Sequence, residues 1–407
     1  MMQGMGEKTR VLYLSYTGLM EPLGQSQVLA YLKLLSECCS ITLVTFEKAE
    51  DLARTAEREA LRKTCAEFGI DWVPRQYHQT PRIPATAWDL TVLLLDIGRC
   101  TLGGKTDLVH CRSYIPAMAA CVAKKLTRVP FVFDMRALWP EEMVTAGTLR
   151  EGGLTYRVLQ RIEKHLMNDA DVVVSLTRAA VEHLRTKYPA VERERYVVIP
   201  TCVELERFRM REDVPRPLTI GSVGTVVSGW YELDWLFRLY QEARKAVPDA
   251  RIKIVTRDDP TRVRAVARSN GVDPACVVLE RATPQQVASK MADMSFGVTL
   301  FKRKLGSAPT RLAEFLACGI PVLANRGVGD MAEIVEEEGV GVVVDDGSAE
   351  SLARGLHAMM AMLQDPNLAS RCWAVAERRF SVASGAQEYR RVYGRLCALG
   401  EDPRDPS

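Results

Sequence analysis

The chain has 407 residues, of which 47% are hydrophobic. It is too long for one ordinary core, and we expect two domains of about 150–200 residues. The 54 basic and 51 acidic residues nearly cancel, which argues against a nucleic-acid-binding protein, since such proteins normally carry a strongly basic face. These sums leave open a small basic patch at a membrane surface.

The eleven cysteines are scattered, and none forms a CxxC pair. Most lie inside apolar runs, where a thiol behaves as a small hydrophobic group. The N-terminus has no apolar signal core, and no stretch approaches the roughly 18 apolar residues that span a bilayer. We therefore expect a cytoplasmic protein, soluble or lying on the inner face of the membrane.

Strands alternate with helices through the first half of the chain, which is typical of crossover connections in a parallel sheet. Strands are expected at residues 10–16, 40–47, 71–76, 106–113, 130–136, 170–177 and 196–200. Helices are expected at residues 24–37, 52–68, 87–100, 116–126, 156–168 and 178–188.

The pattern restarts after residues 201–219, a polar, proline-bearing stretch without periodicity. Strands are expected at residues 219–224, 250–256, 276–280, 295–301, 320–325 and 341–345. Helices are expected at residues 232–247, 260–270, 284–292, 308–318 and 327–338. The stretch 377–396 is predicted to be one basic amphipathic helix that crosses back onto the first domain, and its charge hints at a membrane surface.

This order predicts the α/β class, with two Rossmann-like doubly wound parallel-sheet domains facing a cleft. We expect an N-terminal domain at 1–203, a C-terminal domain at 204–376, and the crossing helix and tail at 377–407. Ligands of open α/β sheets bind beyond the carboxyl ends of the strands, so the loops that follow strands are the ones to examine.

The loop after the first strand contains Gly18 and Gly24 and leads into a helix. Glycines let backbone N–H groups approach an anion at a helix N-terminus, although a plain turn explains them equally well. No GxGxxG, HExxH, GxSxG or P-loop sequence occurs in the chain, which argues against nicotinamide enzymes and the commonest hydrolases and NTPases.

A basic run lies at a strand end in the second half: Lys302, Arg303 and Lys304, with Arg311 in the helix that follows. Ser307 is the expected cap of that helix. A diphosphate at this place would gain charge-assisted hydrogen bonds, and Arg311 is the leading candidate. Glu314 lies one turn further on the same helix face, where it would accept ribose hydroxyls or form a weak surface pair with Arg311.

Polar residues also end two strands of the first half. His110 and Arg112 end one strand, and Asp134, Arg136 and Glu141 follow the next. Polar side chains at strand ends in a cleft are candidates for acceptor binding. The alternative is that His110 is a core histidine and that Asp134 and Arg136 only cap a strand.

The stretch "PTRLAEFLACGIPVLAN" resembles the nucleotide-sugar signature of the family 4 glycosyltransferases, which have the GT-B fold and retain the anomeric configuration of the transferred sugar. The resemblance extends over nearly the whole chain, and it implies that residues 1–203 form the acceptor-side domain and residues 204–376 the nucleotide-sugar-binding domain. It includes "YLSYTGLMEPLGQSQVLAYL", "DLVHCRSY", "FDMRALWPEE", "DADVVVSLTRAAVEHL", "VIPTCVELERF", "GSVGTVVSGWYELDWL" and "GVGDMAEIVEEEGVGVVV". The resemblance implies that Glu314 holds the donor ribose, that Arg311, next to Thr310, holds the diphosphate, and that Gly18 and Gly24 approach the phosphates.

The chain departs from the family pattern at several positions. Gly306 stands where many members have a second glutamate, and Arg311 replaces the usual lysine. Where the first loop of the second domain usually has an Arg and a Lys, this chain has Ser228, Trp230 and Tyr231. Arg112 stands where many members have a histidine, and Lys302 would serve as the second phosphate cation.

The sequence thus predicts a retaining hexosyltransferase that uses a nucleotide diphosphate sugar, UDP more than GDP, and requires no metal or other cofactor. Arg311 and Lys302 would stabilise the departing diphosphate, and Asp134 would act on the acceptor side. The expected acceptor is a saccharide or lipid-linked hydroxyl in polysaccharide or glycolipid synthesis. Two alternatives stay open: a non-catalytic partner subunit of the same fold, and a UDP-sugar 2-epimerase.

Overall fold

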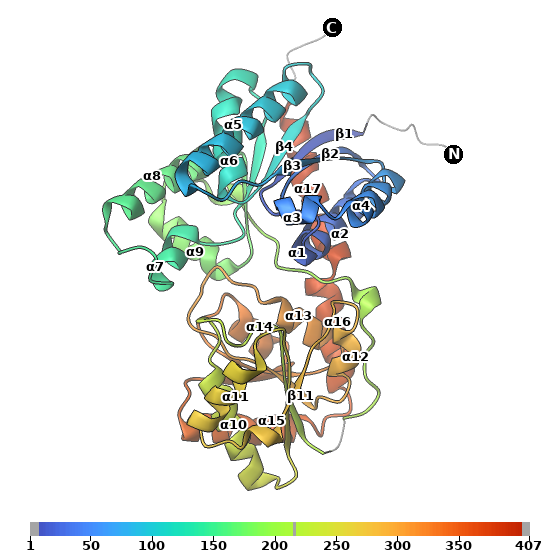
Figure 1. Ribbon diagram of the computed structural model, residues 1–407, viewed down its shortest axis with the longest axis vertical. Coiled ribbons are helices and arrows are strands. Elements are labelled where there is room, and N and C mark those ends of the chain that lie inside the picture. Colours follow the sequence, from blue (N-terminus) through green and yellow to red (C-terminus); the bar gives the residue numbers. More distant parts are fainter. Residues whose placement is uncertain (1–7, 215–216, 401–407) are drawn as a thin grey trace. The chain divides into compact units, whose positions relative to one another are not determined.

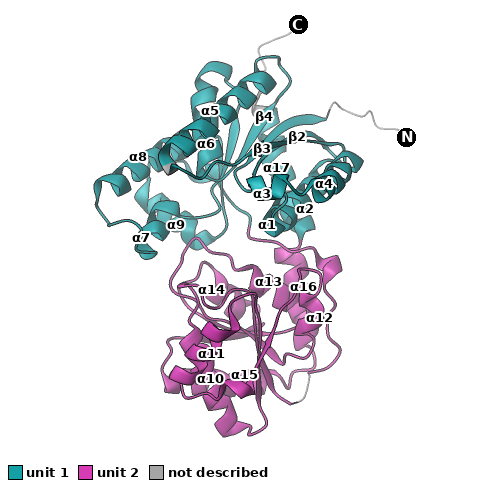
Figure 2. Cartoon of the chain, viewed as in Figure 1, with its two compact units in different colours: residues 1–199, 382–407 teal, residues 200–381 magenta. Residues whose placement is uncertain are grey.

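The computed structural model describes residues 8–214 and 217–400, apart from the side chains of Arg82, Leu399 and Gly400. The chain divides into two compact units (Figure 2). Unit 1 consists of residues 1–199 and 382–407, and unit 2 consists of residues 200–381. The expected boundaries, after residues 203 and 376, lie near these two crossing points.

Unit 1 contains a seven-stranded parallel sheet in the order β3-β2-β1-β4-β5-β6-β7. Its strands are β1 Thr9–Ser15, β2 Cys39–Glu47, β3 Ile70–Gln76, β4 Leu108–Arg112, β5 Phe131–Asp134, β6 Val172–Ser175 and β7 Tyr196–Val198. The central strands are apolar runs buried on both faces, as a parallel sheet covered by helices requires. In the register, Ser15 pairs with Arg112 and Arg112 with Asp134, so the sheet itself brings polar strand ends together.

The helices of unit 1 follow the expected order with local differences (Figure 1). They are α1 Pro22–Gly24, the π-helical turn Gln25–Leu29, α2 Ala30–Leu35, α3 Ala49–Leu52, α4 Thr55–Glu67, α5 Arg82–Thr101, α6 Tyr114–Thr127, α7 Trp139–Thr145, α8 Leu154–Asp169, α9 Arg178–Lys187 and α17 Val382–Gly400, with a 3₁₀ turn at Arg193–Arg195. The helix expected at 24–37 is therefore three consecutive segments, and α7 was not predicted.

Unit 2 contains a six-stranded parallel sheet in the order β10-β9-β8-β11-β12-β13. Its strands are β8 Thr219–Val223, β9 Arg251–Val255, β10 Val277–Glu280, β11 Phe296–Thr299, β12 Val322–Asn325 and β13 Gly341–Val344. Its helices are α10 Leu233–Ala246, α11 Pro260–Ser269, α12 Val287–Met291, α13 Thr310–Ala317, α14 Met331–Glu337, α15 Ala349–Met362 and α16 Leu368–Phe380, with 3₁₀ turns at Leu205–Arg207 and Pro274–Cys276. Sequence patterns did not predict α15 or the greater part of α16.

The expected single helix at 377–396 is wrong, because the chain is extended at Ser381. There it forms a parallel bridge with Val203, whose N–H donates to the carbonyl of Phe380 at 2.8 Å. The helix α16 thus ends in unit 2, and α17 (red in Figure 1) packs on α2 and β4 of unit 1.

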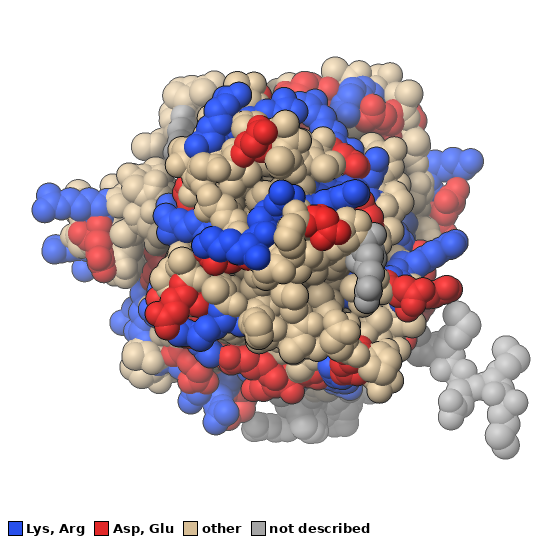
Figure 3. Space-filling view, turned by 90° about the horizontal axis from the view of Figure 1, so that it is seen from below, with Lys and Arg blue, Asp and Glu red and all other residues tan. Residues whose placement is uncertain are grey.

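Basic and acidic side chains lie beside one another on the face shown in Figure 3. Such mixing agrees with the near-zero net charge and shows no extended basic surface on that face. Within residues 8–214 and 217–400, no helix is long and apolar enough to cross a membrane.

Candidate functional site

The helix α13 begins at the carboxyl edge of the unit 2 sheet. Pro309 is its N-cap, with φ −64° and ψ 120°, and no side chain caps it. The expected capping role of Ser307 is therefore wrong, and the helix starts two residues later than predicted. Thr310 and Arg311 occupy its first two positions, so its first turn presents them at the strand ends.

Arg311 is held between aromatic rings and a loop carbonyl. Its guanidinium carbon lies 5.1 Å from the ring centroids of both Tyr231 and Phe301. Its Nη2 donates to the carbonyl of Thr225, while its buried Nη1 has no hydrogen-bond partner. Burial lowers the pKa of Arg311, but guanidinium remains charged at any physiological pH. The side chain therefore offers an unused donor and a positive charge.

Glu314 follows one turn later and is half-buried. Neither Glu314 nor Arg311 makes an ion pair within the described part of the chain, so the weak surface pair considered from the sequence does not form. Burial raises the pKa of Glu314 to about 7, against the opposing effect of Arg311 and Arg207. A desolvated carboxylate without a partner is costly in a purely structural role.

Trp230 and Tyr231 of the "GWY" stretch pack near Arg311 in different ways. The ring of Tyr231 packs against Phe301 at 5.3 Å, while its hydroxyl forms a 2.8 Å hydrogen bond with Ser222 Oγ in the core. Trp230 is half-buried and has the ammonium of Lys304 4.7 Å from its ring centroid. Tyr231 thus supports Arg311 through its ring, and its hydroxyl points away from the strand-end loops.

The other expected donor residues lie in the same loops. The backbone N–H of Lys302 donates to the carbonyl of Trp230 at 2.9 Å, and its side chain is exposed. The carbonyl of Ser228 accepts from the N–H of Tyr231 at 3.2 Å. Lys302, Ser228 and Trp230 therefore lie at the same edge of the sheet as Arg311.

Two further residues of this edge were not predicted from the sequence. Gly224 has φ +88°, and a Cβ there would lie 2.9 Å from Arg311 Nε and Nη2. Asp258, in the loop after β9, accepts from the backbone N–H groups of Val226 and Val227 at 2.7 and 2.9 Å. The sequence could have indicated Asp258 only through its acidic side chain and its position in a loop that follows a strand.

In unit 1, the loop with Gly18 and Gly24 is closed by a buried carboxylate. Glu47 accepts from the N–H groups of Leu19 and Met20 at 2.7 and 3.1 Å. A Cβ on Gly18 would lie 2.4 Å from Glu47 Oε2, and one on Gly24 would lie 2.0 Å from the carbonyl oxygen of Gly18. Close packing thus accounts for both glycines, and two of the loop's N–H groups already serve Glu47.

His110 is fully buried at β4. Its ring stacks on Tyr13, with centroids 4.2 Å apart, and its Nδ1 forms a 2.8 Å hydrogen bond with the hydroxyl of Tyr393 from α17. Burial lowers the pKa of His110, so the ring is neutral at pH 7. Tyr393 lies 283 residues away in the sequence, and no local pattern could have indicated it.

Asp134 lies at the centre of this cluster and accepts from the hydroxyl of Tyr389 at 3.0 Å. Burial opposes its ionisation, but Arg136, His110 and Arg112 together lower the pKa of Asp134 below its usual value. Arg112 and Arg136 lie 3.7 and 3.6 Å from its carboxylate oxygens. Asp134 Oδ1 faces Arg136 Nη1 at 3.6 Å and Asp134 Oδ2 faces His110 Nε2 at 3.5 Å, so these buried atoms contact one another just beyond hydrogen-bond distance.

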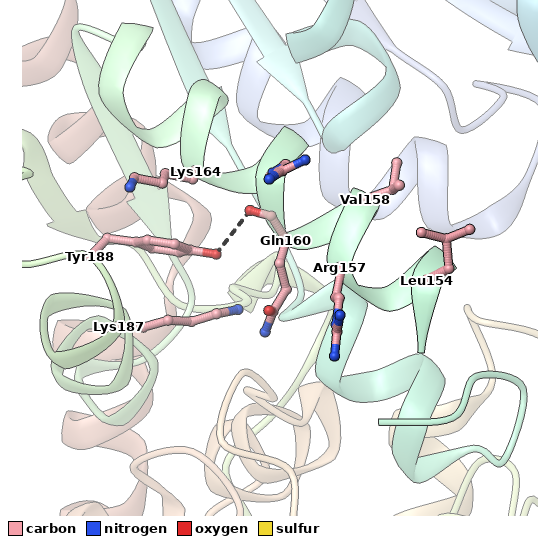
Figure 4. A pocket seen from close by; sticks show the side chains of 8 residues that line it. Leu154, Arg157, Val158, Gln160, Lys164, Lys187 and Tyr188 are labelled. Carbon is pink, nitrogen blue, oxygen red and sulfur yellow. Dashed lines mark hydrogen bonds between the residues drawn. The ribbon is translucent and has the colours of Figure 1, made fainter. Parts of the chain in front are cut away.

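Glu141 belongs to a different cluster. Lys187 Nζ lies 2.5 Å from Glu141 and 2.7 Å from the buried Glu163, which also accepts from the hydroxyls of Tyr114 and Tyr188. The structure therefore brings together four of the five predicted acceptor-side residues and places Glu141 in an ion-pair network. That network borders a pocket of about 550 Å³ on α8 (Figure 4).

The described residues contain no group of three or more His, Cys, Asp or Glu side chains arranged to hold a metal ion.

Comparison with known proteins gives a consistent result across both units. Residues 27–202 match the glycosyl transferase 4-like domain, and residues 217–362 match the glycosyl transferases group 1. The alpha-maltose-1-phosphate synthase of Mycolicibacterium smegmatis is 22% identical over 342 residues, which cover 79% of this chain and 87% of that protein.

Solved structures show the same fold. A glycosyltransferase from Rickettsia africae has a TM-score of 0.71 at 14% identity, covering 98% of this chain and 100% of its own. Anabaena HepE in complex with UDP has a TM-score of 0.65 at 15% identity, covering 95% and 100%.

Proposed function

Because the chain belongs to the family 4 glycosyltransferases and has their GT-B fold, we propose that it moves a hexosyl group from a UDP-sugar to an acceptor hydroxyl with retention of configuration. The observation that carries the donor assignment lies on α13: among the described residues, the buried Nη1 of Arg311 has no hydrogen-bond partner and the half-buried Glu314 forms no ion pair. A nucleoside diphosphate supplies what both lack, namely an anion for the guanidinium and hydroxyl donors for the carboxylate.

Arg311 binds the diphosphate, helped by Lys302 and by the helix N-terminus at Thr310. As the glycosidic bond to the leaving group breaks, negative charge grows on the diphosphate, and these fixed positive groups stabilise it. Glu314 accepts ribose hydroxyls and so orients the nucleotide. Anabaena HepE, which has the same fold, is described in complex with UDP, UDP and glucose, and UDP-glucose, and this supports UDP as the nucleotide.

On the acceptor side, Asp134 is the proposed catalytic carboxylate, held ionised by Arg136 and Arg112. His110 and Asp134 are both fully buried, and His110 Nε2, 3.5 Å from Asp134 Oδ2, would position that carboxylate. Glu141 remains a proposed acceptor contact from its separate cluster. The acceptor class is a saccharide or lipid-linked hydroxyl, and synthesis of a polysaccharide or glycolipid at the inner face of the membrane is its setting.

Two observations favour a non-catalytic subunit as the second candidate. Gly306 is buried and carries no carboxylate, and Asp258 already occupies two N–H groups of the loop after β8. Both features would weaken contacts to a donor sugar while leaving the fold intact.

A binding titration of the full chain with UDP, GDP, ADP and CMP tests the proposal. Glu314→Ala should reduce the affinity for UDP, because the ribose hydroxyls lose their acceptor. Glu337→Ala, on the exposed face of α14, is the matched control and should bind as the wild type does. Selective UDP binding lost only in Glu314→Ala supports the donor site, while absence of binding to all four nucleotides favours the non-catalytic subunit.

A further inference from the structure

Exposed large hydrophobic side chains gather on three helices of unit 1. These helices are α5, α6 and α8, which lie side by side, with α6 contacting both of the others (Figure 1). The side chains are Trp88, Leu95, Val122, Leu126, Leu154 and Val158. Leu126 and Leu154 are 84% and 81% exposed, and Trp88 is 60% exposed, so these residues do not serve the core of unit 1.

Basic residues share these helix surfaces with the apolar ones. On α8, Leu154, Arg157, Val158 and Arg161 recur at spacings of three and four and therefore lie along one face. Lys125 stands between Val122 and Leu126 on α6 in the same way.

The acidic residues of the three helices face inward. Asp89 and Asp96 of α5 and Glu163 of α8 are buried, and α6 has no acidic residue. Asp169, at the end of α8, is half-buried and accepts from Cys121. The exposed surface of these helices is thus apolar and positive, without exposed carboxylates to neutralise it.

The pocket on α8 adds a place for an anionic group. Its lining includes the exposed Arg157, Arg161 and Lys164 and the exposed Leu154 and Val158 (Figure 4). Lys187 also lines it, but its ammonium is already paired with Glu141 and Glu163. An anionic lipid is complementary to this arrangement, because its charged head group would contact the basic residues while its acyl chain would contact the apolar ones.

The terminal helix α17, whose basic charge hinted at a membrane surface, makes its contacts within unit 1. Arg390 pairs with Glu37, Arg391 pairs with Glu388, and Arg395 donates to the carbonyl of Glu194. On its other face, the aromatic and aliphatic side chains of α17 are buried in unit 1.

We propose that the outer face of α5, α6 and α8, including the basic face of α8, binds the surface of a bilayer that contains anionic lipids. The apolar side chains enter the interface while the cations attract lipid head groups. The proposal does not rest on sugar transfer, because membrane binding is measured without donor or acceptor, and the two can fail separately.

The test is sedimentation of the full chain with vesicles of phosphatidylcholine alone and of phosphatidylcholine with phosphatidylglycerol. Arg157→Glu/Arg161→Glu should weaken binding to the anionic vesicles by about tenfold or more, since each basic residue near such a surface contributes about fivefold. The control is Arg264→Glu/Arg268→Glu on α11, which reverses two exposed arginines at the same spacing in unit 2.

A second variant, Leu154→Ser/Val158→Ser, tests the apolar contribution and should also weaken binding, because both side chains are exposed and their loss leaves the core unchanged. Thermal unfolding confirms that each variant is folded. Binding lost only in the α8 variants supports the proposal. Equal loss of binding in the α11 control, no binding by the wild type, or equal binding to neutral vesicles overturns the proposal. A dimer of the wild type in solution that dissociates in the α8 variants also overturns it.

Discussion

The guanidinium of Arg311 lies against the rings of Tyr231 and Phe301 and donates to the carbonyl of Thr225, while its buried Nη1 has no hydrogen-bond partner among the described residues. We expect Arg311→Ala to weaken UDP binding about tenfold or more, because one charge-assisted contact of about 1.5–3 kcal/mol is lost. Arg311→Lys should recover part of the affinity, since it keeps the charge but loses the planar fork. Isothermal titration calorimetry measures both.

Arg264→Ala, at an exposed arginine on α11, serves as the control for lost net charge. Unchanged affinity in a folded Arg311→Ala protein would remove this residue from the donor site.

Glu314 should make stability depend on pH. Its pKa rises from 4.5 to about 7 on folding, so the folded state favours the protonated form. The Glu314 carboxyl therefore does not lower the free energy of unfolding below pH 4.5. Between pH 4.5 and 7 it lowers that free energy increasingly, because Glu314 ionises in the unfolded chain but stays protonated in the folded one. Glu314→Gln should raise the free energy of unfolding above pH 7 by on the order of 1–3 kcal/mol, and by nothing near pH 4.5.

Urea unfolding of Glu314→Gln and wild type at several pH values measures this difference. Glu337→Gln should show no such dependence, because that side chain is exposed. A constant difference between Glu314→Gln and wild type at all pH values would contradict the raised pKa.

At the scale of elements, the loop after β8 depends on one left-handed residue. Gly224 has φ +88°, and an added Cβ would lie within 2.9 Å of the Arg311 guanidinium. Gly224→Ala should therefore destabilise the protein by roughly 1–3 kcal/mol and displace Arg311, so that UDP affinity falls as well. Urea unfolding and UDP titration measure the two effects.

Gly229 lies in the same loop with open space around it and no positive φ. Gly229→Ala should thus leave both quantities nearly unchanged. Equal effects of the two substitutions would show that loop flexibility, rather than the position of Arg311, is what matters.

Local patterns predicted most strands and helices, because buried parallel strands are apolar runs and the helices have clear apolar faces. The exceptions have physical reasons. The helix α7 has only seven residues and begins with Trp139 and Pro140, which gives too few turns for a periodic signal. The break at Ser381 comes from pairing with Val203, while the helical pattern continues through it.

The candidate site also contains some residues that sequence spacing brings together and others that only the fold brings together. Arg311 and Glu314 share one helix face, so sequence spacing alone brings them together. Glu47, by contrast, closes the glycine loop from the end of another strand. Tyr389 and Tyr393 reach Asp134 and His110 from the far end of the chain. Contacts at such separation depend on the whole fold, and only the resemblance to a family could indicate that these strand ends belong to a site.

At the scale of the whole molecule, unit 1 is built from two distant parts of the chain. The helix α17 buries Tyr389, Val392, Tyr393 and Leu396 in unit 1, and two of its hydroxyls bond to Asp134 and His110. Ending the chain after Ser381 should therefore destabilise unit 1 by about 5 kcal/mol or more, at roughly 1.5–3 kcal/mol for each large buried side chain. Unit 2, residues 200–381, keeps all of its own elements.

Hydrogen exchange resolved by peptide measures the two units separately. In the truncated protein, amides of β4 and β5 should lose protection, while those of β11 and β12 should keep it, because local opening follows local packing. The variant Tyr393→Phe is the milder companion: it leaves His110 Nδ1 without its partner and should cost about 1–3 kcal/mol in unit 1. Equal loss of protection in both sheets would mean that the units unfold together, and α17 would then stabilise the molecule as one cooperative body.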